Sequence, residues 1–310
     1  MTEKIATREA YGQSLAELGE TNPSVVVLDA DLSCSTKTIH FAKKFPERFF
    51  NMGVSEQDMM GTAAGFSLCG KIPFASSFAM FATGRAFEIV RNSIAYPHLN
   101  VKICATHAGL TVGEDGASHQ ALVDVTIMRA LPGMTVIVPA DGTEVRQIIP
   151  KIAEYEGPVY VRLARAASPI LFGDDYQFEI GKAKVMREGN DLTFIACGLM
   201  VFHCLEAAKI LESQGIQCTV INMSTIKPLD TETIKTWAAK TGRVMTVEEH
   251  SILGGLGSAV AETLAEEGKT PVHRYGVKDQ FGQSGKASDL LEHYKLTPEH
   301  IAEEAKTFLK

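Results

Sequence analysis

The sequence predicts an α/β protein with two doubly wound domains, each a mostly parallel sheet covered by helices on both faces. Three observations indicate this fold. Short apolar runs alternate with helix-like segments along the chain. Runs such as VVVLD at 25–29 are continuously apolar, which is typical of parallel strands buried on both faces. The alternation stops once, at 166–190, where turn-forming residues dominate, and then begins again.

The first alternation predicts a domain over 1–170. It opens with a helix at 7–21, which has Tyr11, Leu15 and Leu18 on one face and ends before Pro23. Strands are expected at 25–29, 49–52, 72–76, 101–106, 134–139 and 159–164, with helices between them at 36–45, 55–68, 83–95, 121–130 and 141–155. Ligand-binding residues of such a sheet lie beyond the carboxyl ends of its strands. The polar residues that follow predicted strands in this way are Asp31, Glu56, His107 and Arg165.

The turn-rich stretch and the second alternation predict a linker and a smaller α/β domain. Turn formers occur at Ser168-Pro169, Gly173-Asp174-Asp175 and Gly189-Asn190, and we place the linker at 171–190 and the second domain at 191–310. Strands are expected at 191–197, 217–222, 243–249 and 271–276, with helices at 200–214, 231–240 and 257–267 and further helices at the end. The glycines at 254–257 open a helix but fit no phosphate-binding loop, so they indicate a tight turn.

Composition limits the function classes. The chain has 310 residues, 45% of them hydrophobic, which suffices for two domains with their own cores. A net charge of −7 argues against a nucleic-acid binder. The sequence contains no apolar run of about 18 residues, so no membrane span is predicted. The charged start is unlike a secretory signal. The six cysteines contain no CxxC pair and mostly lie in apolar runs, so we expect free buried thiols in a reducing cytoplasm and no zinc site.

Glu56 stands at the centre of the sequence FNMGVSEQDMMGTAAGFSLCG, which covers 50–70. The chain breaks at Gly53 and then enters a helix of small and apolar residues with Glu56 in its first turn. One interpretation is an acid that complements the helix dipole, a contribution of about 0.3–1 kcal/mol. The other is a buried acid whose proton is used in catalysis. Position alone leaves both open.

A second stretch, THAGLTVGEDGASHQ at 106–120, favours the catalytic interpretation. Together the two stretches resemble the transketolase family of thiamine-diphosphate enzymes. The shared pattern is Gly-Val-x-Glu, then Phe-x-x-Phe, then Thr-His, then Gly-Glu-Asp-Gly-x-x-His-Gln. The resemblance covers almost the whole chain but only part of a full-length transketolase. It implies a pyrimidine-binding domain followed by a C-terminal domain, as in the C-terminal subunit of a split transketolase.

The resemblance implies a binding site for the pyrimidine end of thiamine diphosphate. Glu56 would engage N1′ of the aminopyrimidine, and an apolar pocket would raise the pKa of such a carboxyl group. Phe78 and Phe81 would form an aromatic wall, although such a pair after a strand is also common in cores. Gly84 stands where the family has a third aromatic residue.

Two residues after the first strand complete the expected cofactor contacts. Leu32 would make an apolar contact to the cofactor. Asp31 would orient the pyrimidine side or its own loop, and its alternative interpretation is a turn aspartate that accepts backbone N–H bonds.

The same resemblance assigns residues to the sugar. His119 would bond the C1 hydroxyl or carbonyl oxygen and act in proton transfer, and Asp115 would accept from the α-hydroxyl. Glu114 would be a buried structural carboxylate.

The resemblance also assigns the sugar phosphate to four residues: Arg8, Ser35, His107 and Arg165. Arg162 competes with Arg165 for this role, and Arg8 has the alternative of a solvated helix start. Arg85 and Arg91 are interpreted as helix-surface or interface charges.

The chain lacks the Gly-Asp-Gly motif with which the family holds Mg²⁺ or Ca²⁺ on the diphosphate; it has GEDG, ADG and FGDD instead. No metal ligand is therefore assigned to this chain. The resemblance implies an N-terminal partner subunit that carries the diphosphate-binding domain, in an α2β2 assembly.

The implied activity belongs to the pentose phosphate pathway. A transketolase moves a two-carbon ketol group from a ketose phosphate to an aldose phosphate through a carbanion intermediate on thiamine diphosphate. Three alternatives stay open: the β subunit of a 2-oxo acid dehydrogenase, a deoxyxylulose-phosphate-synthase-like enzyme, and a regulatory paralogue without activity. The Glu-Asp-Gly-x-x-His-Gln segment and the phosphate-binding arginines are not needed by a dehydrogenase, and the intact acidic and histidine residues argue against a paralogue.

Overall fold

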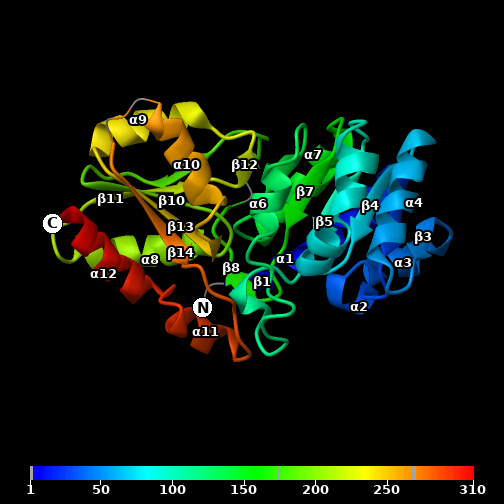
Figure 1. The fold of residues 1–310 in the computed structure, drawn as a ribbon, viewed down its shortest axis with the longest axis horizontal. Coiled ribbons are helices and arrows are strands. Elements are labelled where there is room, and N and C mark those ends of the chain that lie inside the picture. The colour runs from blue at the N-terminus through cyan, green and yellow to red at the C-terminus, as the bar shows by residue number, and fades with distance from the viewer. Residues whose placement is uncertain (1–2, 174, 267, 269) are drawn as a thin grey trace.

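The protein folds into two α/β units that lie side by side, each a sheet with helices on both faces (Figure 1). The computed structural model describes residues 3–173, 175–266, 268 and 270–310. Residues 1 and 2 of the predicted first domain, Asp174 of the predicted linker, and residue 267 at the end of the predicted helix 257–267 lie outside the described residues. The predicted fold class is confirmed.

The first unit is built on a seven-stranded sheet. Its strands run in the order β12-β6-β7-β5-β4-β2-β3 and pair in parallel, except that β12 is antiparallel to β6. The strand bounds are β2 Val25–Asp29, β3 Phe49–Asn51, β4 Ile72–Ser76, β5 Lys102–Ala105, β6 Thr135–Ile137, β7 Val159–Arg162 and β12 Thr225–Lys227. All five residues of β2 are buried, as expected of a strand covered on both faces.

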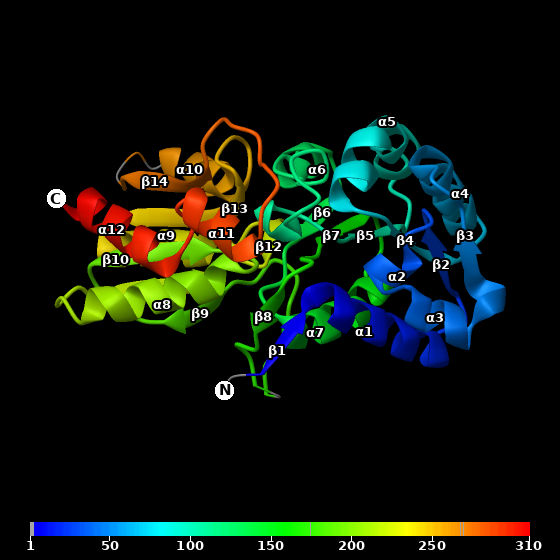
Figure 2. The same cartoon turned by 90° about the horizontal axis from the view of Figure 1, so that it is seen from below.

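Helices cover both faces of this sheet, as Figure 2 shows. One face carries α1 (Thr7–Thr21), α3 (Ile39–Lys44) and α7 (Gly142–Glu154), and the other carries α4 (Glu56–Leu68), α5 (Phe87–Ile89) and α6 (Asp124–Arg129). The loops that follow β2, β3, β4, β5 and β7 all emerge at one edge of the sheet, because these strands are parallel.

The second unit is a five-stranded sheet in the order β14-β13-β10-β11-β9, in which only β9 is antiparallel to its neighbour. The strand bounds are β9 Lys184–Arg187, β10 Leu192–Ala196, β11 Cys218–Asn222, β13 Val244–Ser251 and β14 Val272–Val277. Helices α9 (Thr231–Thr241) and α10 (Leu256–Ala265) cover one face, and α8 (Met200–Glu212) and α12 (Pro298–Leu309) cover the other (Figure 1). The short α11 (Ala287–His293) lies near the first unit.

Several short strands have no counterpart in the prediction. β1 (Lys4–Ala6) pairs with β8 (Ala167–Pro169), β9 lies inside the predicted linker, and β12 crosses from the second unit to the first sheet. Each is a three- or four-residue segment whose partner is distant in sequence. Their pairing is decided by tertiary contacts, since a local pattern this short carries little signal.

Two predicted helices are interrupted. The helix predicted at 36–45 begins later, as α3 at Ile39, and a separate short α2 (Ser33–Thr36) precedes it, because Lys37 between them has a left-handed backbone with a φ of 73°. The segment predicted at 83–95 is a π-helical turn at Phe81–Arg85, then α5, then a second π-helical turn at Val90–Ala95. Such turns are rare, and many occur at functional sites.

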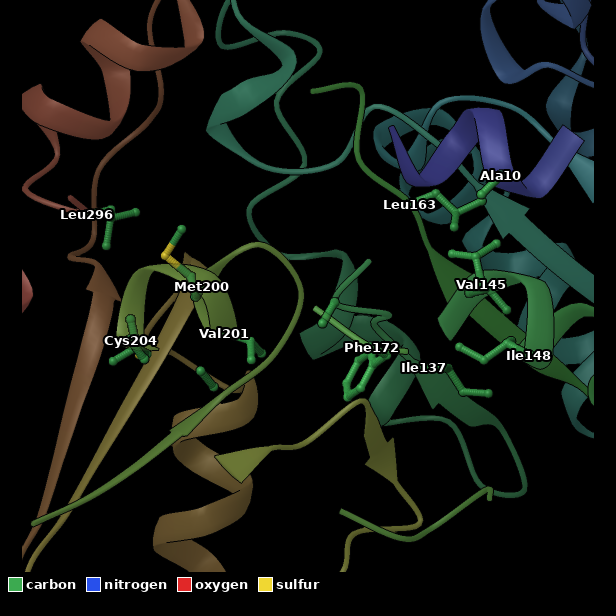
Figure 3. Packing of buried hydrophobic residues seen from close by; sticks show 14 of the residues in the cluster. Ala10, Ile137, Val145, Ile148, Leu163, Phe172, Met200, Val201, Cys204 and Leu296 are labelled. Atoms are coloured by element: carbon green, nitrogen blue, oxygen red, sulfur yellow. The ribbon is translucent and has the colours of Figure 1, made fainter. Parts of the chain in front are cut away.

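The two units share a continuous core. Figure 3 shows side chains that pack from the second unit to the first, in the order Cys204, Met200, Val201, Phe172, Ile137, Ile148, Val145. Phe172 is only 6% exposed and lies between the two units. This shared core, together with β12, fixes the second unit beside the site loops of the first. No helix in the described ranges is both long and apolar enough to cross a bilayer.

Four of the six cysteines are buried, as expected. Cys34 and Cys69 are exposed, so the expectation of a buried thiol was wrong for these two, which lie in or next to helical segments and not inside apolar strands.

Candidate active site

The predicted site residues gather at the carboxyl edge of the seven-stranded sheet. Most of them follow one of five parallel strands, so residues far apart in sequence meet there. Asp31 and Leu32 follow β2, Glu56 follows β3, Phe78 and Phe81 follow β4, the loop with His107, Asp115 and His119 follows β5, and Arg165 follows β7. Arg8 lies in the first turn of α1, and Ser35 lies in α2.

Aromatic and imidazole rings from two of these loops form one cluster. Phe78 is almost buried and stacks on His107, with ring centroids 3.8 Å apart. The ring centroids of Phe81 and Phe78 are 6.1 Å apart. The His119 ring contacts Phe81 edge-on, with centroids 5.2 Å apart. Phe81 remains partly exposed. The loop after β4 and the loop after β5 therefore share one aromatic surface.

Glu56 is the first residue of α4 and is only 1% exposed. Its Oε2 accepts a hydrogen bond from Arg85 Nη1 at 3.0 Å. The Arg85 guanidinium also lies over the Phe81 ring, 5.0 Å from its centroid. The interpretation of Arg85 as a surface or interface charge was therefore incomplete, because this half-exposed side chain is the ion-pair partner of Glu56. A spacing of 29 residues gives no sequence signal for such a pair.

Gly84 is the position at which the resemblance implied a third aromatic residue. A Cβ added to Gly84 would meet only the terminal methyl group of Met80, at 3.3 Å. The residue is exposed and belongs to the first π-helical turn, next to Arg85.

A group of cationic and imidazole side chains lies beside the aromatic cluster. Arg8 Nη1 donates to the carbonyl oxygen of Ser35 at 2.7 Å and lies 3.5 Å from His107 Nε2. Arg8 Nε is buried and has no hydrogen-bond partner among the described residues. Burial and the charge of Arg165 both lower the pKa of Arg8. Like charges held together around an unpaired donor are the features of an anion site.

His107 is held as a neutral ring. Its backbone has a φ of 57°, an uncommon conformation that in proteins clusters at functional sites. Its Nδ1 lies 2.9 Å from Thr106 Oγ1. Burial, and after it the nearby charges of Arg8 and Arg165, together lower the pKa of the imidazole to about 3. His107 can therefore form a neutral hydrogen bond to a ligand between two guanidinium groups.

This environment predicts the titration of His107. We expect its ring signals in NMR spectra, assigned with a His107→Gln variant, to show no protonation between pH 5 and 8. An added phosphate ester should raise the pKa, because an anion offsets the repulsion by Arg8 and Arg165. The unfolded ring, with a pKa near 6.5, binds a proton that the folded ring does not, so acidification below that pH should favour unfolding. A midpoint above pH 5 in the ligand-free chain would contradict this account.

The structure distinguishes the two competing arginines. Arg162 is almost buried, and its Nε donates to Asp124 Oδ2 at 2.8 Å while Nη2 donates to the carbonyl of Ala121 at 3.1 Å. Arg165 is about one-third exposed, and its Nη1 lies 3.8 Å from the Asp115 carboxylate. The same Nη1 also donates to the carbonyl of Val112 in the site loop. Arg165 therefore keeps a partly exposed guanidinium beside this loop, whereas Arg162 is almost buried among structural contacts. We expected Glu114 to be buried. Its side chain is 71% exposed in this chain and lies 3.9 Å from Arg165, so this expectation was wrong for the chain alone.

Asp115 and His119 extend over the cationic group from the same loop. The Asp115 side chain is 39% exposed, and His119 Nδ1 lies 2.9 Å from Ser118 Oγ. Both side chains are accessible to a ligand, next to Arg165 and Phe81 respectively.

Asp29, which the sequence interpretation left aside, shapes the loop after β2. It is fully buried, and its Oδ1 accepts from the Leu32 N–H at 2.6 Å. Its Oδ2 accepts from the hydroxyl groups of Thr36 at 2.7 Å and Thr38 at 2.8 Å. Asp31 is exposed, has a φ of 64° and accepts from Asn51 Nδ2 at 2.8 Å. An acid that ends a buried apolar strand was the available signal for Asp29.

Replacing Asp29 by alanine should destabilise the chain by about 3 kcal/mol, because three donors lose a buried acceptor. Asp31→Asn is the matched control, since its side chain is exposed and should change the free energy of unfolding by only about 0.5 kcal/mol. Urea unfolding of both variants measures this difference. Equal losses of unfolding free energy in the two variants would show that Asp29 does not stabilise this loop.

Comparison with known proteins supports the same assignment along the chain. Residues 3–169 match the family model "Transketolase, pyrimidine binding domain", and residues 181–301 match "Transketolase, C-terminal domain". A Methanocaldococcus jannaschii protein provisionally named a transketolase C-terminal section is 55% identical, over 95% of this chain and 93% of that protein. The 6-deoxy-6-sulfo-D-fructose transketolase subunit SqwH of a Clostridium species is 42% identical, over 96% and 92%.

Solved structures agree with these relatives. A structure titled "Split gene transketolase, inactive beta4 tetramer" has a TM-score of 0.91 and 55% identity, and 99% of each chain is covered. The transketolase of Campylobacter jejuni has a TM-score of 0.84 and 26% identity, and 99% of this chain covers 47% of that one. The chain therefore belongs to the transketolase family and contains that family's pyrimidine-binding and C-terminal domains.

Proposed function

We propose that this chain is one subunit of a transketolase that moves a two-carbon ketol group from a ketose phosphate to an aldose phosphate. The observation that carries the proposal is the group formed by Arg8, His107 and Arg165. It lies beside the accessible Asp115 and His119, so an anion-binding end and a hydroxyl-binding end share one surface.

The anionic end of the sugar would bind between the two arginines. A phosphate would accept from Arg165 and from the unpaired Nε of Arg8, and the neutral His107 would add a hydrogen bond without adding repulsion. The name of the Clostridium relative includes a sulfo-sugar, which also carries an anionic group. Ser35 contributes by holding Arg8 through its backbone carbonyl.

The hydroxyl end of the sugar would meet Asp115 and His119. Asp115 would accept from the α-hydroxyl, which selects its configuration. His119 would bond the oxygen at C1 or at the carbonyl and exchange a proton with it as general acid and base.

The residues around Glu56 fit the pyrimidine end of thiamine diphosphate. A buried carboxylate beside a partly exposed aromatic ring offers a partner for a ring nitrogen and a surface for stacking. When bound, thiamine diphosphate supplies the carbon centre that accepts and releases the ketol group. Glu56 would hold the proton at N1′, and Phe81 would stack on the pyrimidine ring. Phe78 would support Phe81, because it contacts both Phe81 and His107. Leu32 and Asp31 would border the ring, and Arg85 would leave Glu56 when the cofactor binds.

A partner chain would complete the site. The sequence has no Gly-Asp-Gly motif, and among the described residues no three His, Cys, Asp or Glu side chains gather as a metal site. We infer that an N-terminal subunit holds the diphosphate through Mg²⁺ or Ca²⁺, in a cytoplasmic α2β2 assembly. The names of two relatives, a transketolase C-terminal section and a transketolase subunit, support a second chain.

The test is an assay of the purified chain alone and mixed with candidate diphosphate-domain chains. The mixture contains xylulose 5-phosphate, ribose 5-phosphate, thiamine diphosphate and Mg²⁺. We expect ketol transfer only when both chains are present. Transfer by this chain alone would contradict the partner requirement. Activity confined to a 2-oxo acid and a lipoyl acceptor would overturn the transketolase proposal in favour of a dehydrogenase β subunit.

A further inference from the structure

The loop at 107–120, which carries His107, Asp115 and His119, has little regular structure of its own. Its only helical turn is a short 3₁₀ segment at Leu110–Val112. Gly109, Gly113 and Gly116 have φ angles of 80°, 86° and 76°, which glycine adopts more readily than other residues. Glycine also loses the most conformational entropy on ordering, so the shape of this loop depends on contacts from outside it.

A carboxylate from the second unit provides such a contact. Glu249 lies in β13, is 5% exposed, and its Oε1 accepts from the backbone N–H of Thr111 at 2.6 Å. The loop backbone packs directly against this carboxylate, because a Cβ added to Gly109 would lie 2.5 Å from Glu249 Cδ. Burial raises the pKa of the Glu249 carboxyl group, while the Arg162 charge and the hydrogen bond from Thr111 lower it.

The C-terminal end of the loop, at Gln120 and Ala121, is also held by hydrogen bonds near Glu249. Arg162 Nη2 donates to the carbonyls of Ala121 and Glu249, at 3.1 Å each. Gln120 Nε2 donates to the carbonyls of Leu110 at 3.1 Å and Gln283 at 3.0 Å. The loop is thus closed on itself and on the second unit, and Glu249 is its side-chain anchor at Thr111.

We propose that Glu249 is a positioning residue: it holds Thr111 and thereby sets the places of Asp115 and His119 over the sugar. This gives the C-terminal domain a direct role in arranging the active site. The inference rests on the proposed function for its kinetic consequence. Its structural part, the anchoring of the loop by a carboxylate of the other unit, can be tested without activity.

Glu248 offers a matched control. It is also buried, at 1% exposure, and it also accepts backbone N–H bonds, from Leu256 and Gly257 at 2.8 Å each. Neighbouring residues of a strand point to opposite faces, so Glu248 anchors α10 within the second unit while Glu249 reaches the loop of the first. Changes at the two positions perturb buried carboxylates equally but should affect different segments.

Two conservative variants distinguish the effect of the length of the Glu249 side chain from the effect of its charge. Glu249→Asp keeps the charge beside Arg162 but withdraws the oxygen from Thr111, and Glu249→Gln keeps an acceptor of the same reach without the charge. In the chain alone, we expect Glu249→Asp to raise amide hydrogen exchange at 109–120 and Glu249→Gln to leave it near the wild-type level. Glu248→Asp should raise exchange at 256–260 instead.

In the assembled enzyme, Glu249→Asp should lower kcat/KM for the ketose phosphate by about 10- to 100-fold, since a misplacement of about 1 Å has effects of this size. Most of the loss should be in kcat, because Arg8 and Arg165 still hold the phosphate. Glu249→Gln should recover most of the activity, and Glu248→Asp should stay near the wild type.

Other results would overturn the inference. Unchanged exchange at 109–120 in Glu249→Asp would show that the loop does not depend on this anchor. Equal kinetic losses in Glu248→Asp and Glu249→Asp would indicate general destabilisation rather than positioning. If the wild-type mixture shows no ketol transfer, the proposed function fails, while the exchange measurements still decide whether Glu249 holds the loop.

Discussion

Replacing Glu56 by glutamine should leave the chain folded and lower the turnover of the assembled enzyme by about 10²- to 10⁴-fold, the usual range for a lost general acid or base. Glutamine fills the same buried space and can still accept from Arg85, so the local structure should persist. It cannot deliver the proton that the proposed role at N1′ requires. Turnover with saturating thiamine diphosphate and partner chain is the measurement.

Asp58→Asn is the matched control for this variant. Asp58 is an exposed acid in the same first turn of α4, so it shares the interaction with the helix dipole but not the burial of Glu56. It should change stability by about 0.3–1 kcal/mol and leave turnover unaltered. Near-native turnover in Glu56→Gln, or an equal loss in Asp58→Asn, would restrict Glu56 to the helix-dipole role.

Arg165→Ala should lower kcat/KM for phosphorylated sugars by about 10- to 100-fold, the loss expected for one charged hydrogen bond of about 1.5–3 kcal/mol. The loss should appear as a raised KM, while an unphosphorylated ketol donor should react at nearly the wild-type rate. Removing Arg165 should also raise the pKa of His107 and of Arg8, because its charge lowers both in the wild type. Steady-state kinetics with paired substrates and the His107 NMR titration measure these two effects.

Arg187→Ala is the control for a lost arginine. Arg187 pairs with Glu212 at 2.8 Å within the second unit, away from the site loops, so its removal should alter neither KM nor the His107 titration. Equal losses for phosphorylated and unphosphorylated donors in Arg165→Ala would mean that Arg165 acts on the site loop, through the Val112 carbonyl or through Asp115 3.8 Å away, and not on the phosphate.

Most of the fold was predictable because its signals are local. Apolar strands such as Val25–Asp29 and the helix at Thr7–Thr21 carry periodic patterns over several residues. The interruptions of two predicted helices could not be predicted from local patterns. Lys37 has a positive φ without being a glycine, and the π-helical turns at Phe81–Arg85 and Val90–Ala95 keep the hydrophobic pattern of an ordinary helix.

For the candidate site, the sequence could place residues after strands but could not give the contacts between them. Parallel topology alone brings the residues after β2, β3, β4, β5 and β7 to one edge, so polar residues that follow these strands are expected to lie near one another. The pairing of Glu56 with Arg85, the choice between Arg162 and Arg165, and the exposure of Glu114 depend on which side chains meet across that edge.

The sequence by itself determined the two α/β domains, the family and the residues that gather at one sheet edge, because apolar periodicity and motif spacing are properties of consecutive residues. Only the tertiary structure decided how the second unit joins the first. β12 in the first sheet, Phe172 in the shared core and Glu249 on the loop at Thr111 are all contacts between distant segments. Their free energy comes from burial and hydrogen bonds that exist only once both units are packed together, so no local pattern can encode them.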